Sequence, residues 1–424
     1  MRRLYSLALY LFLPLALIYL AIRSLRNSDY RRRWPERLGF FEPPPETGGI
    51  VVHAASLGEV NAANALVRSL LQRSPRRPVV LTTFTPSGSE RARALFSGQL
   101  FHVYIPLDLP GAVHRFFDRL QPERVIVMET EIWPNLYHEA RRRRLPLLLV
   151  NARISERSVR GYRRFHALGA QTLRQLSGIG AQTEADAERL VQLGADREII
   201  TVTGNLKFDL QLPPSLHEQG QAIRTAWGAH RPVLVAGSTH EGDEIALLQA
   251  FRGLLASSPG ALLVLAPRHP ERFGRAAQLA RAAGLRVCLR SEGISCPATT
   301  QCFVVDAMGE LLAFYAAGDV AFVGGSLAPV GGHNVLEPAA LSKPVVVGPH
   351  TANFKDITAE LVAQKAALRV QGKSDLEAAL KRLFREPDLR DRMGRAGERI
   401  VQSGQGALQR TLDLLDGVLT PAGR

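Results

Sequence analysis

The sequence predicts two α/β domains, each built on a parallel sheet that is covered by helices on both faces. Three observations predict this fold class. The chain has 424 residues, which exceeds one ordinary domain; apolar residues make up 46% of it; and short apolar runs alternate with helical stretches from residue 48 onward. Strands that alternate with helices form parallel sheets with helices on both sides. We therefore expect two α/β domains of similar size that face a cleft.

The expected strands fall into two series, which are separated by a stretch rich in Pro, Gln and Ser at residues 210–217. The first series follows a helix-and-strand pattern with strands at residues 50–54, 79–83, 102–105, 124–128, 147–150, 179–182 and 200–202. The second series has strands at residues 233–236, 262–265, 286–289, 303–305, 320–323 and 344–347. The tail, residues 375–415, is expected to be helical. We accordingly divide the chain into an N-terminal segment, 1–25, a first domain, 26–210, and a second domain, 211–424.

The N-terminal segment contains an apolar, uncharged run, residues 4–22, that is long enough to span a bilayer as a helix. Arg2 and Arg3 precede the run. The heavier positive flank follows it and consists of Arg23, Arg26, Arg31, Arg32, Arg33 and Arg37. This asymmetry predicts a membrane anchor with the remaining chain on the cytoplasmic face of the membrane. A cleaved signal peptide and an interfacial helix that does not fully cross are the alternatives.

The composition indicates a partner that carries negative charge, and the absence of two glycine motifs argues against two kinds of enzyme. The formal net charge is +14, which is typical of proteins that meet nucleic acid, an anionic membrane or a phosphorylated substrate. The run 141–144, four consecutive arginines, is either a solvated helix face or a contact for lipid phosphate. Cys288, Cys296 and Cys302 form no Cys-x-x-Cys pair and are interpreted as reduced thiols. Neither a P-loop nor a dinucleotide-binding glycine pattern follows a strand, which argues against ATP hydrolysis and NAD chemistry.

Three residues of the first domain are candidates for chemistry because they follow strands, where ligands bind in such sheets. Glu59 opens a helix and is either a capping acid or a general base. Glu129 is followed two residues later by Glu131; an extended chain would point both to the same side, whereas a turn after Met128 would part them. Lys207 could hold a phosphate or carboxylate as a point charge, or be a surface lysine in a turn.

In the second domain the most informative stretch is residues 324–338, where two glycine pairs bracket a loop that leads to His333, Asn334 and Glu337. Glycine pairs let the backbone approach a ligand, and a helix start offers free N–H groups to an anion. A tight turn with a helix cap is the alternative interpretation. Three further strand ends, residues 237–242, 266–270 and 306–310, combine glycine, hydroxyl, histidine or arginine residues in ways that suit either phosphate contact or ordinary turns.

Taken together, these motifs resemble the 3-deoxy-D-manno-octulosonic acid (Kdo) transferases of lipopolysaccharide synthesis, and the resemblance runs over essentially the whole chain. The residues that carry it are the apolar N-terminus, Ser-Leu-Gly-Glu at 56–59, Met-Glu-Thr-Glu-Ile-Trp-Pro-Asn at 128–135, Asn-Ala-Arg at 151–153, Gly-Asn-Leu-Lys-Phe-Asp at 204–209, Pro-Arg-His-Pro at 267–270, and the stretch 324–338. The resemblance implies an inverting, metal-independent glycosyltransferase with two Rossmann-like domains, the GT-B fold. No cofactor is expected.

The resemblance also implies residue roles and partners. Glu59 would be the general base, and Glu129 and Lys207 would stabilise the transition state. The cytidine monophosphate (CMP) part of the donor CMP-Kdo would be bound by Pro267, Arg268, Met308, Gly309, Glu310, Asn334, Val335, Leu336 and Glu337. The acceptor would be the lipid A precursor, met at the anionic inner membrane.

Two other functions fit some of the same features. A UDP-sugar transferase that acts on a polyprenyl lipid would keep the fold and change the donor. A membrane-anchored nucleic-acid-binding protein would explain the charge, but only 7% of the residues are aromatic and no stacking platform accompanies the basic clusters. We therefore expect no nucleic-acid partner.

Overall fold

The computed structural model of the protein describes residues 1–26, 33–73, 75–162, 166–210 and 212–419. The chain folds into two compact units. Unit 1 comprises Met1–Asp209 and Gly404–Arg424, and unit 2 comprises Leu210–Ser403. The expected division assigned all of residues 211–424 to one domain, whereas the chain returns to unit 1 at Gly404. Residue 211 itself lies outside the described residues, as do Arg31 and Arg32 of the predicted positive flank.

Unit 1 is built on a seven-stranded parallel sheet with the strand order β3-β2-β1-β4-β5-β6-β7 in the described residues. The strands are β1 (Ile50–His53), β2 (Val79–Thr83), β3 (Phe101–Tyr104), β4 (Arg124–Met128), β5 (Leu147–Ala152), β6 (Gly178–Ala181) and β7 (Ile200–Val202). All seven lie where the sequence predicts them. They are nearly continuous apolar runs because both faces of a parallel sheet are buried.

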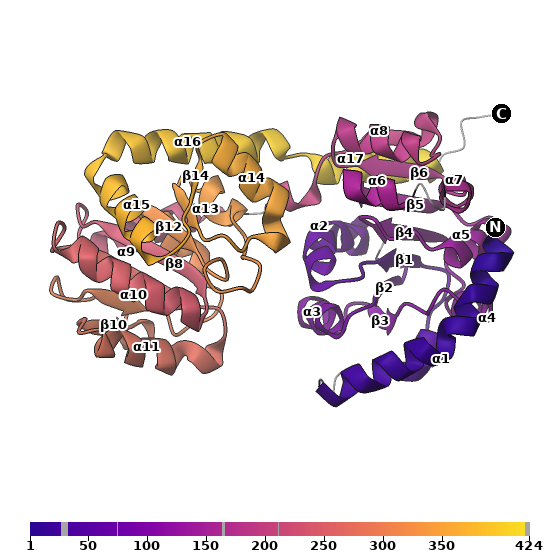
Figure 1. Ribbon diagram of the computed structural model, residues 1–424, viewed down its shortest axis with the longest axis horizontal. Helices are drawn as coiled ribbons and strands as arrows, with labels where there is room; N and C mark the ends of the chain where they lie inside the picture. Colours follow the sequence, from indigo (N-terminus) through magenta and orange to yellow (C-terminus); the bar gives the residue numbers. More distant parts are fainter. Residues whose placement is uncertain (27–32, 74, 163–165, 211, 420–424) are drawn as a thin grey trace. The chain divides into compact units, whose positions relative to one another are not determined.

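Helices cover both faces of this sheet (Figure 1). One face packs on α4 (Pro110–Leu120), α5 (Pro134–Arg142), α6 (Glu156–Tyr162), α7 (His166–Leu173) and α8 (Glu184–Gln192). The other face packs on α2 (Leu57–Arg73), α3 (Pro86–Phe96) and α17 (Ala407–Leu419). Successive side chains of a strand point to opposite faces, so each strand contributes to two core clusters. Val51, for example, belongs to the first cluster and Val52 to the second. Short 3-10 turns complete the unit: η2 (Trp34–Leu38), η4 (Arg197–Ile199) and η5 (Leu206–Phe208).

The C-terminal helix α17 belongs to unit 1 because Asp209 fixes its start. The Asp209 carboxylate accepts hydrogen bonds from the backbone N–H groups of Gly406 (2.7 Å) and Leu408 (2.5 Å). Arg410 in turn donates to the carbonyl oxygen of Thr203 at 2.8 Å. The apolar side of α17, including Leu412 and Leu415, then closes the core beside β6 (Figure 1). Its amphipathic pattern alone predicts a helix but not which sheet it covers.

Unit 2 repeats the plan with a second seven-stranded parallel sheet of order β10-β11-β9-β8-β12-β13-β14 in the described residues. Its strands are β8 (Val233–Thr239), β9 (Leu262–Pro267), β10 (Val287–Leu289), β11 (Cys302–Val304), β12 (Val320–Val323), β13 (Val345–Val347) and β14 (Ala367–Arg369). The sequence prediction missed β14, because a three-residue edge strand that ends in an exposed arginine has no distinctive pattern.

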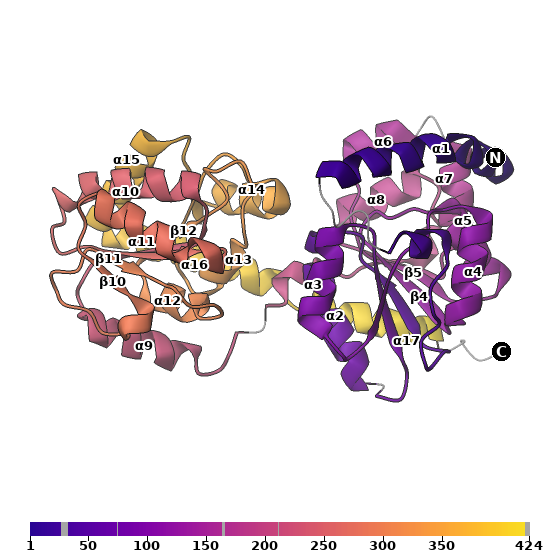
Figure 2. The ribbon, with the colours of Figure 1, turned by 90° about the horizontal axis from the view of Figure 1, so that it is seen from below.

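The second sheet is also covered on both faces. Figure 2 shows α10 (Glu241–Leu255) and α11 (Phe273–Ala282) on one side and α9 (Leu216–Trp227) and α12 (Leu311–Ala317) on the other, in agreement with the two core clusters. The remaining elements are η6 (Pro270–Arg272), η7 (Arg290–Glu292), α13 (Leu336–Ala340), η8 (Ala352–Phe354), α14 (Lys355–Ala363), α15 (Lys373–Arg385) and α16 (Pro387–Gly404). The predicted helical tail is thus confirmed as α15, α16 and α17.

The N-terminal apolar run is helical, as α1 (Arg2–Arg26), and its first turns are bound to unit 1. Ser6 donates to the side-chain oxygen of Asn135 at 3.0 Å, and Tyr5 donates to Asp108 at 3.1 Å. Across the part of the chain that the structure describes, no helix is both long enough and apolar enough to cross a membrane. The predicted spanning anchor is therefore not confirmed.

Removing the carboxylate that fixes α17 should weaken unit 1. Asp209→Ala leaves the N–H groups of Gly406 and Leu408 without their acceptor, and we expect a loss of about 2 kcal/mol in the free energy of unfolding. Urea denaturation of the full chain measures it. The control is Asp413→Asn on the exposed side of the same helix, which should unfold like the wild type. Equal stability of Asp209→Ala and wild type would contradict this account of the C-terminus.

Candidate active site

The strand order of unit 1 reverses between β1 and β4, which are neighbours in the sheet but are joined by chain that runs through β2 and β3. Open α/β sheets bind ligands outside the carboxyl ends of their strands at such a reversal. The segment after β1 leads to Glu59, and the segment after β4 begins with Glu129. Two of the three catalytic candidates therefore come from the two strands that form the reversal.

Glu59 is held in a fixed position by the loop that precedes α2. Its carboxylate accepts a hydrogen bond from the N–H of Ala55 (2.8 Å) and another from the hydroxyl of Ser56 (2.9 Å). The N–H of Glu59 donates back to the Ser56 hydroxyl oxygen at 3.3 Å. Ser56 thus accepts the N–H of Glu59, as in a capping box, but the Glu59 carboxylate bonds to the N–H of Ala55 rather than to that of Ser56. Glu59 therefore takes part in the hydrogen bonds at the start of α2, as the capping interpretation expects. The side chain is only 8% exposed, which also makes it an unusual acid.

The environment of Glu59 favours its neutral form. Burial raises the pKa of the Glu59 carboxyl from 4.5 to about 8, and the negative charges of Glu129 and Glu131 add to this shift. The hydrogen bonds from Ala55 and Ser56 oppose it. A carboxylate that has lost water and faces other carboxylates holds a proton tightly, and it is therefore a strong base once it is deprotonated. Capping and proton abstraction are thus compatible roles for one side chain.

Glu129 lies at a sharp turn in the chain and pairs with the third candidate. Its φ is +55°, in the left-handed region that residues other than glycine rarely adopt. The turn aims the carboxylate at Lys207, whose Nζ lies 3.9 Å from Oε1. Lys207 is placed by η5, which follows β7, and Asn151 supports that turn by accepting the N–H of Leu206 at 3.0 Å. The structure therefore brings Glu129 and Lys207 together.

Glu131 does not share the position of Glu129, because the chain turns directly after Met128. Its carboxylate accepts a hydrogen bond from the indole N–H of Trp133 at 2.7 Å. The Nε2 atom of His53, which is fully buried, lies 3.9 Å away. Of the two arrangements that the sequence allowed, the structure shows the one in which the two acids part. Both remain close enough to Glu59 to raise its pKa.

In unit 2 the strand order reverses between β8 and β12, and the candidate donor residues again follow these strands and their neighbours. Arg268 follows β9, and its N–H donates to the carbonyl oxygen of Thr239 at 3.0 Å. Its guanidinium has no ion-pair partner among the described residues, whereas the nearby Arg272 pairs with Glu241 (3.1 Å) and Glu244 (2.5 Å). A partly exposed arginine without a carboxylate partner at the end of a parallel strand is suited to bind an anion.

The stretch after β12 places Asn334 and Glu337 together. Asn334 donates to the Glu337 carboxylate at 3.0 Å and accepts the N–H of Leu336 at 3.1 Å. Burial raises the pKa of Glu337, and the positive charge of Arg268 opposes that shift, so these residues lie near one another. Val335 and Leu336 are buried and anchor the segment in the core. The helix that begins here, α13, spans only five residues, so the predicted helix-end anion site is a single short turn.

The remaining candidate segment, Met308, Gly309 and Glu310, follows β11 at the same edge of the sheet. Met308 is 55% exposed. Gly309 has φ +89°, a left-handed backbone conformation that glycine adopts more readily than other residues. Glu310 is engaged by Arg290 through a two-pronged ion pair with distances of 2.7 and 3.2 Å. The segment is therefore an exposed turn whose acid is already partnered.

Asp243 is a residue that the sequence interpretation missed. Its buried carboxylate accepts four backbone N–H groups: His240 at 3.0 Å, Gly325 at 2.7 Å, and Leu327 and Ala328 at 2.9 Å each. It thereby ties the start of α10 to the glycine loop after β12. An acid three residues after an N-cap position was the available signal, since that spacing is typical of capping.

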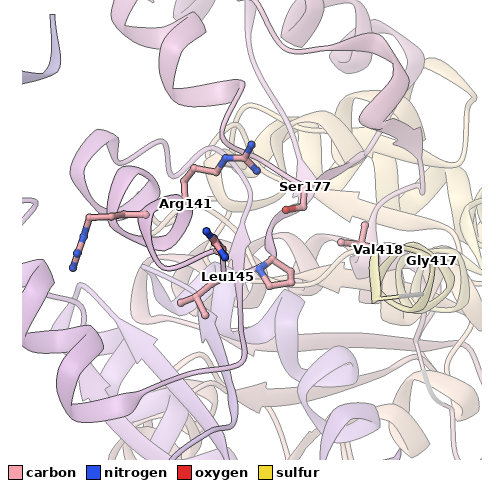
Figure 3. A pocket seen from close by; sticks show the side chains of 8 residues that line it. Arg141, Leu145, Ser177, Gly417 and Val418 are labelled. Carbon is pink, nitrogen blue, oxygen red and sulfur yellow. The ribbon is translucent and has the colours of Figure 1, made fainter. Parts of the chain in front are cut away.

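The four-arginine run leads to a separate hollow at the opposite edge of the first sheet (Figure 3). Pro146 and Ser177 directly precede β5 and β6, so this hollow lies at the amino ends of the strands, away from Glu59. Its lining consists of Arg141, Arg142, Arg144, Leu145, Pro146, Ser177, Gly417 and Val418. It contains none of the predicted catalytic or donor-binding residues.

Comparison with known proteins shows the family. Residues 32–210 match the family described as 3-deoxy-D-manno-octulosonic-acid transferase. The 3-deoxy-D-manno-octulosonic acid transferase of Haemophilus influenzae is 43% identical over 416 residues, which cover 97% of each chain. The corresponding transferase of Bordetella pertussis is 40% identical over 429 residues, covering 98% of this chain and 99% of that protein.

A solved structure extends the comparison to the fold. The crystal structure of a glycosyltransferase from Rickettsia africae covers 89% of this chain and 100% of its own, with a TM-score of 0.54 at 13% sequence identity. Two parallel Rossmann-like sheets in one chain are thus a GT-B-like fold, as predicted. On the sequence identities, the chain belongs to the 3-deoxy-D-manno-octulosonic acid transferase family.

Proposed function

We propose that this enzyme transfers Kdo from CMP-Kdo to the lipid A precursor, with inversion at the anomeric carbon and with Glu59 as the general base. Family membership makes the chain a CMP-Kdo-dependent Kdo transferase. The acceptor, the mechanism and the residue roles are the proposal. The observation that carries it is the buried Glu59 carboxyl, fixed by Ala55 and Ser56 and raised in pKa beside Glu129.

The proposed chemistry begins with the acceptor hydroxyl. The Glu59 carboxylate removes its proton as the oxygen attacks the anomeric carbon of Kdo, and the bond from that carbon to the phosphate oxygen breaks with its electron pair leaving on CMP. Lys207 supplies a positive charge next to Glu129, and both are held by backbone turns, which suits stabilisation of developing charge. A base of high pKa is matched to an alcohol better than an ordinary carboxylate is.

Donor binding is assigned to unit 2. Pro267 and Arg268, the turn Met308–Gly309–Glu310, and the segment Asn334–Glu337 would hold CMP-Kdo through its CMP part. The guanidinium of Arg268, which has no ion-pair partner in the part of the chain that the structure describes, would meet the phosphate. The Asn334–Glu337 pair offers both a donor and acceptors for the ribose or base. With cationic side chains for the leaving phosphate, we expect the transfer to need no metal.

A membrane surface is the proposed setting. The helix α1 is fixed to unit 1 through Tyr5 and Ser6 and presents a row of apolar side chains to solvent. Among the side chains of α1 that the structure describes, those at least 55% exposed include Leu4, Leu7, Leu11, Phe12, Leu15, Ile18, Ile22 and Leu25. An exposed apolar patch of this kind, on a chain of net charge +14, suits binding to an anionic bilayer on the cytoplasmic face of the inner membrane.

Removing the base should abolish turnover and spare the donor site. Glu59→Gln keeps the size of the side chain and the contact with Ser56, and we expect kcat to fall by at least about 100-fold because a general base is lost. Product formation from CMP-Kdo and lipid A precursor is followed by mass spectrometry, and CMP binding by calorimetry. Turnover within a few-fold of wild type would remove Glu59 as the base. Glu46→Gln, an exposed acid before β1, is the matched control.

The pH profile should report the raised pKa of Glu59. The base acts only when deprotonated, so kcat/KM should rise about tenfold per pH unit below about 8 and level off above it. Glu129→Gln removes one negative charge that raises the Glu59 pKa, so its profile should level off at lower pH whatever its absolute rate. A wild-type profile that is flat from pH 5 upward would contradict the assignment.

Charging the apolar side of α1 should weaken membrane binding. Leu11→Glu combined with Leu15→Glu puts two carboxylates on the exposed row, and we expect at least roughly tenfold weaker binding to vesicles of anionic phospholipid. Vesicle flotation measures it. The control combines Val191→Glu with Ile245→Glu, two exposed apolar residues elsewhere on the chain. Unchanged flotation of the α1 variant would count against the proposed surface.

A further inference from the structure

Two histidines of unit 2 are in direct contact at the strand reversal. His240 follows β8 and His333 ends the glycine loop after β12, and the two strands are neighbours in the sheet. Their Nε2 atoms lie 3.0 Å apart, and the rings are nearly parallel, with centroids 5.3 Å apart and an angle of 8°. Both side chains are partly exposed at the carboxyl edge of the sheet. No function proposed above uses this contact.

The contact is a hydrogen bond between two imidazoles, and its chemistry limits the charge of the pair. One Nε2 carries a proton and the other accepts it, an arrangement that a neutral pair can form. A first additional proton can go to the Nδ1 atom of the ring that donates, which leaves the bond intact and gives both rings an Nδ1–H. A second would place two N–H groups against each other at 3.0 Å. The pair can therefore take up one proton.

The pair is held in place by the backbone around it. Asp243 accepts the N–H of His240 and that of Gly325, and so joins the two segments that carry the rings. His333 packs against Gly325, where a Cβ atom would lie 2.9 Å from the ring carbon Cδ2. Gly325 has φ +66°, so a larger side chain is disfavoured there on both counts. The rings are therefore positioned by the fold rather than by a chance surface rotamer.

The surroundings of the pair are cationic. The charged and titratable groups that face it from neighbouring elements are Asp243 in α10, Arg268 and His269 after β9, and Arg272 in η6. Burial lowers the pKa of His333 to about 4, and Arg268, His240 and His269 contribute to this shift. Burial also lowers the pKa of His240, opposed by Asp243. Near neutral pH both rings are therefore neutral when no ligand is bound. An anion beside Arg268 would offset the positive charges and favour protonation of the pair.

A metal site is a poorer interpretation of the same rings. Zinc sites use three or four protein ligands, and here two ring nitrogens face each other. Within the described ranges, no group of three or more His, Cys, Asp or Glu residues is arranged to hold a metal ion. The third ring, His269, meets His240 edge to face with centroids 5.6 Å apart.

We infer that His240 and His333 form a proton-accepting pair that becomes singly charged when the phosphate of CMP binds beside Arg268. The inference rests on the proposed donor site and adds two positioning residues to it. When the bond between Kdo and the phosphate oxygen breaks, CMP gains a second negative charge. A singly protonated pair offers that phosphate two Nδ1–H donors and a net positive charge. The proton returns to solvent when CMP leaves.

Proton-linked binding of CMP tests the pair. Calorimetry of the full chain with CMP, at pH 7 to 8 in two buffers of different ionisation enthalpy, counts the protons taken up. In this range the CMP phosphate is largely a dianion, since its second pKa is about 6. We expect net uptake approaching about one proton per CMP at the lower end of the range, and CMP affinity that falls by up to about tenfold per pH unit. Cytidine, which lacks the phosphate, should bind without uptake.

Variants separate the pair from its surroundings. His333→Gln and His240→Gln should each bind CMP with no proton uptake and no pH slope, and His230→Gln, an exposed histidine of the same unit, should behave like wild type. Thermal unfolding checks that each variant is folded. Uptake by His333→Gln equal to wild type, or wild-type binding of CMP without uptake, would overturn the inference and leave the donor site standing. Failure of the wild type to bind CMP would overturn both.

Discussion

The burial of the Glu59 carboxyl is the constraint on which the account of this enzyme depends. A carboxylate removed from water is costly unless it is hydrogen-bonded, and here Ala55 and Ser56 supply two hydrogen bonds while Glu129 and Glu131 work against the charge. The result is an acid that is held firmly in place and whose pKa is raised to about 8. The same position of the Glu59 carboxylate therefore allows it to bond to the backbone at the start of α2 and to accept a proton. The fold of unit 1 fixes that position.

The two units place their polar residues at the same position of the sheet but use different residue types. In each sheet the chain order reverses at one pair of strands, β1 with β4 and β8 with β12, and the polar residues gather at their carboxyl ends. In unit 1 the gathering is acidic with one lysine, which suits proton transfer. In unit 2 the carboxylate of the buried Asp243 is fully hydrogen-bonded to backbone N–H groups. The groups left at this edge are the Arg268 cation and a histidine pair that can take up a proton. That division matches acceptor activation in one unit and binding of an anionic donor in the other.

Most of the fold could be predicted from the sequence because parallel strands buried on both faces are apolar runs, and thirteen of them stood out between helical stretches. The edge strand β14 has three residues and gave no such signal. The return of α17 to unit 1 depends on Asp209, a contact between positions almost two hundred residues apart, which periodicity cannot reveal. In the site, strand ends pointed to Glu59, Glu129 and Lys207. The parting of Glu131 from Glu129 depends on a left-handed backbone turn, and the contact of His240 with His333 depends on strand order, so neither follows from spacing.

The central claim, that Glu59 is a buried base of raised pKa, can be measured without turnover. Carbon-13 NMR of protein labelled at the glutamate carboxyl carbons, with Glu59→Gln as the reference to be subtracted, isolates the titration of this single side chain. If Glu59 is the buried base, its titration in the enzyme without substrates has a midpoint near pH 8. A midpoint near 4.5, the value of an ordinary glutamate, would contradict it.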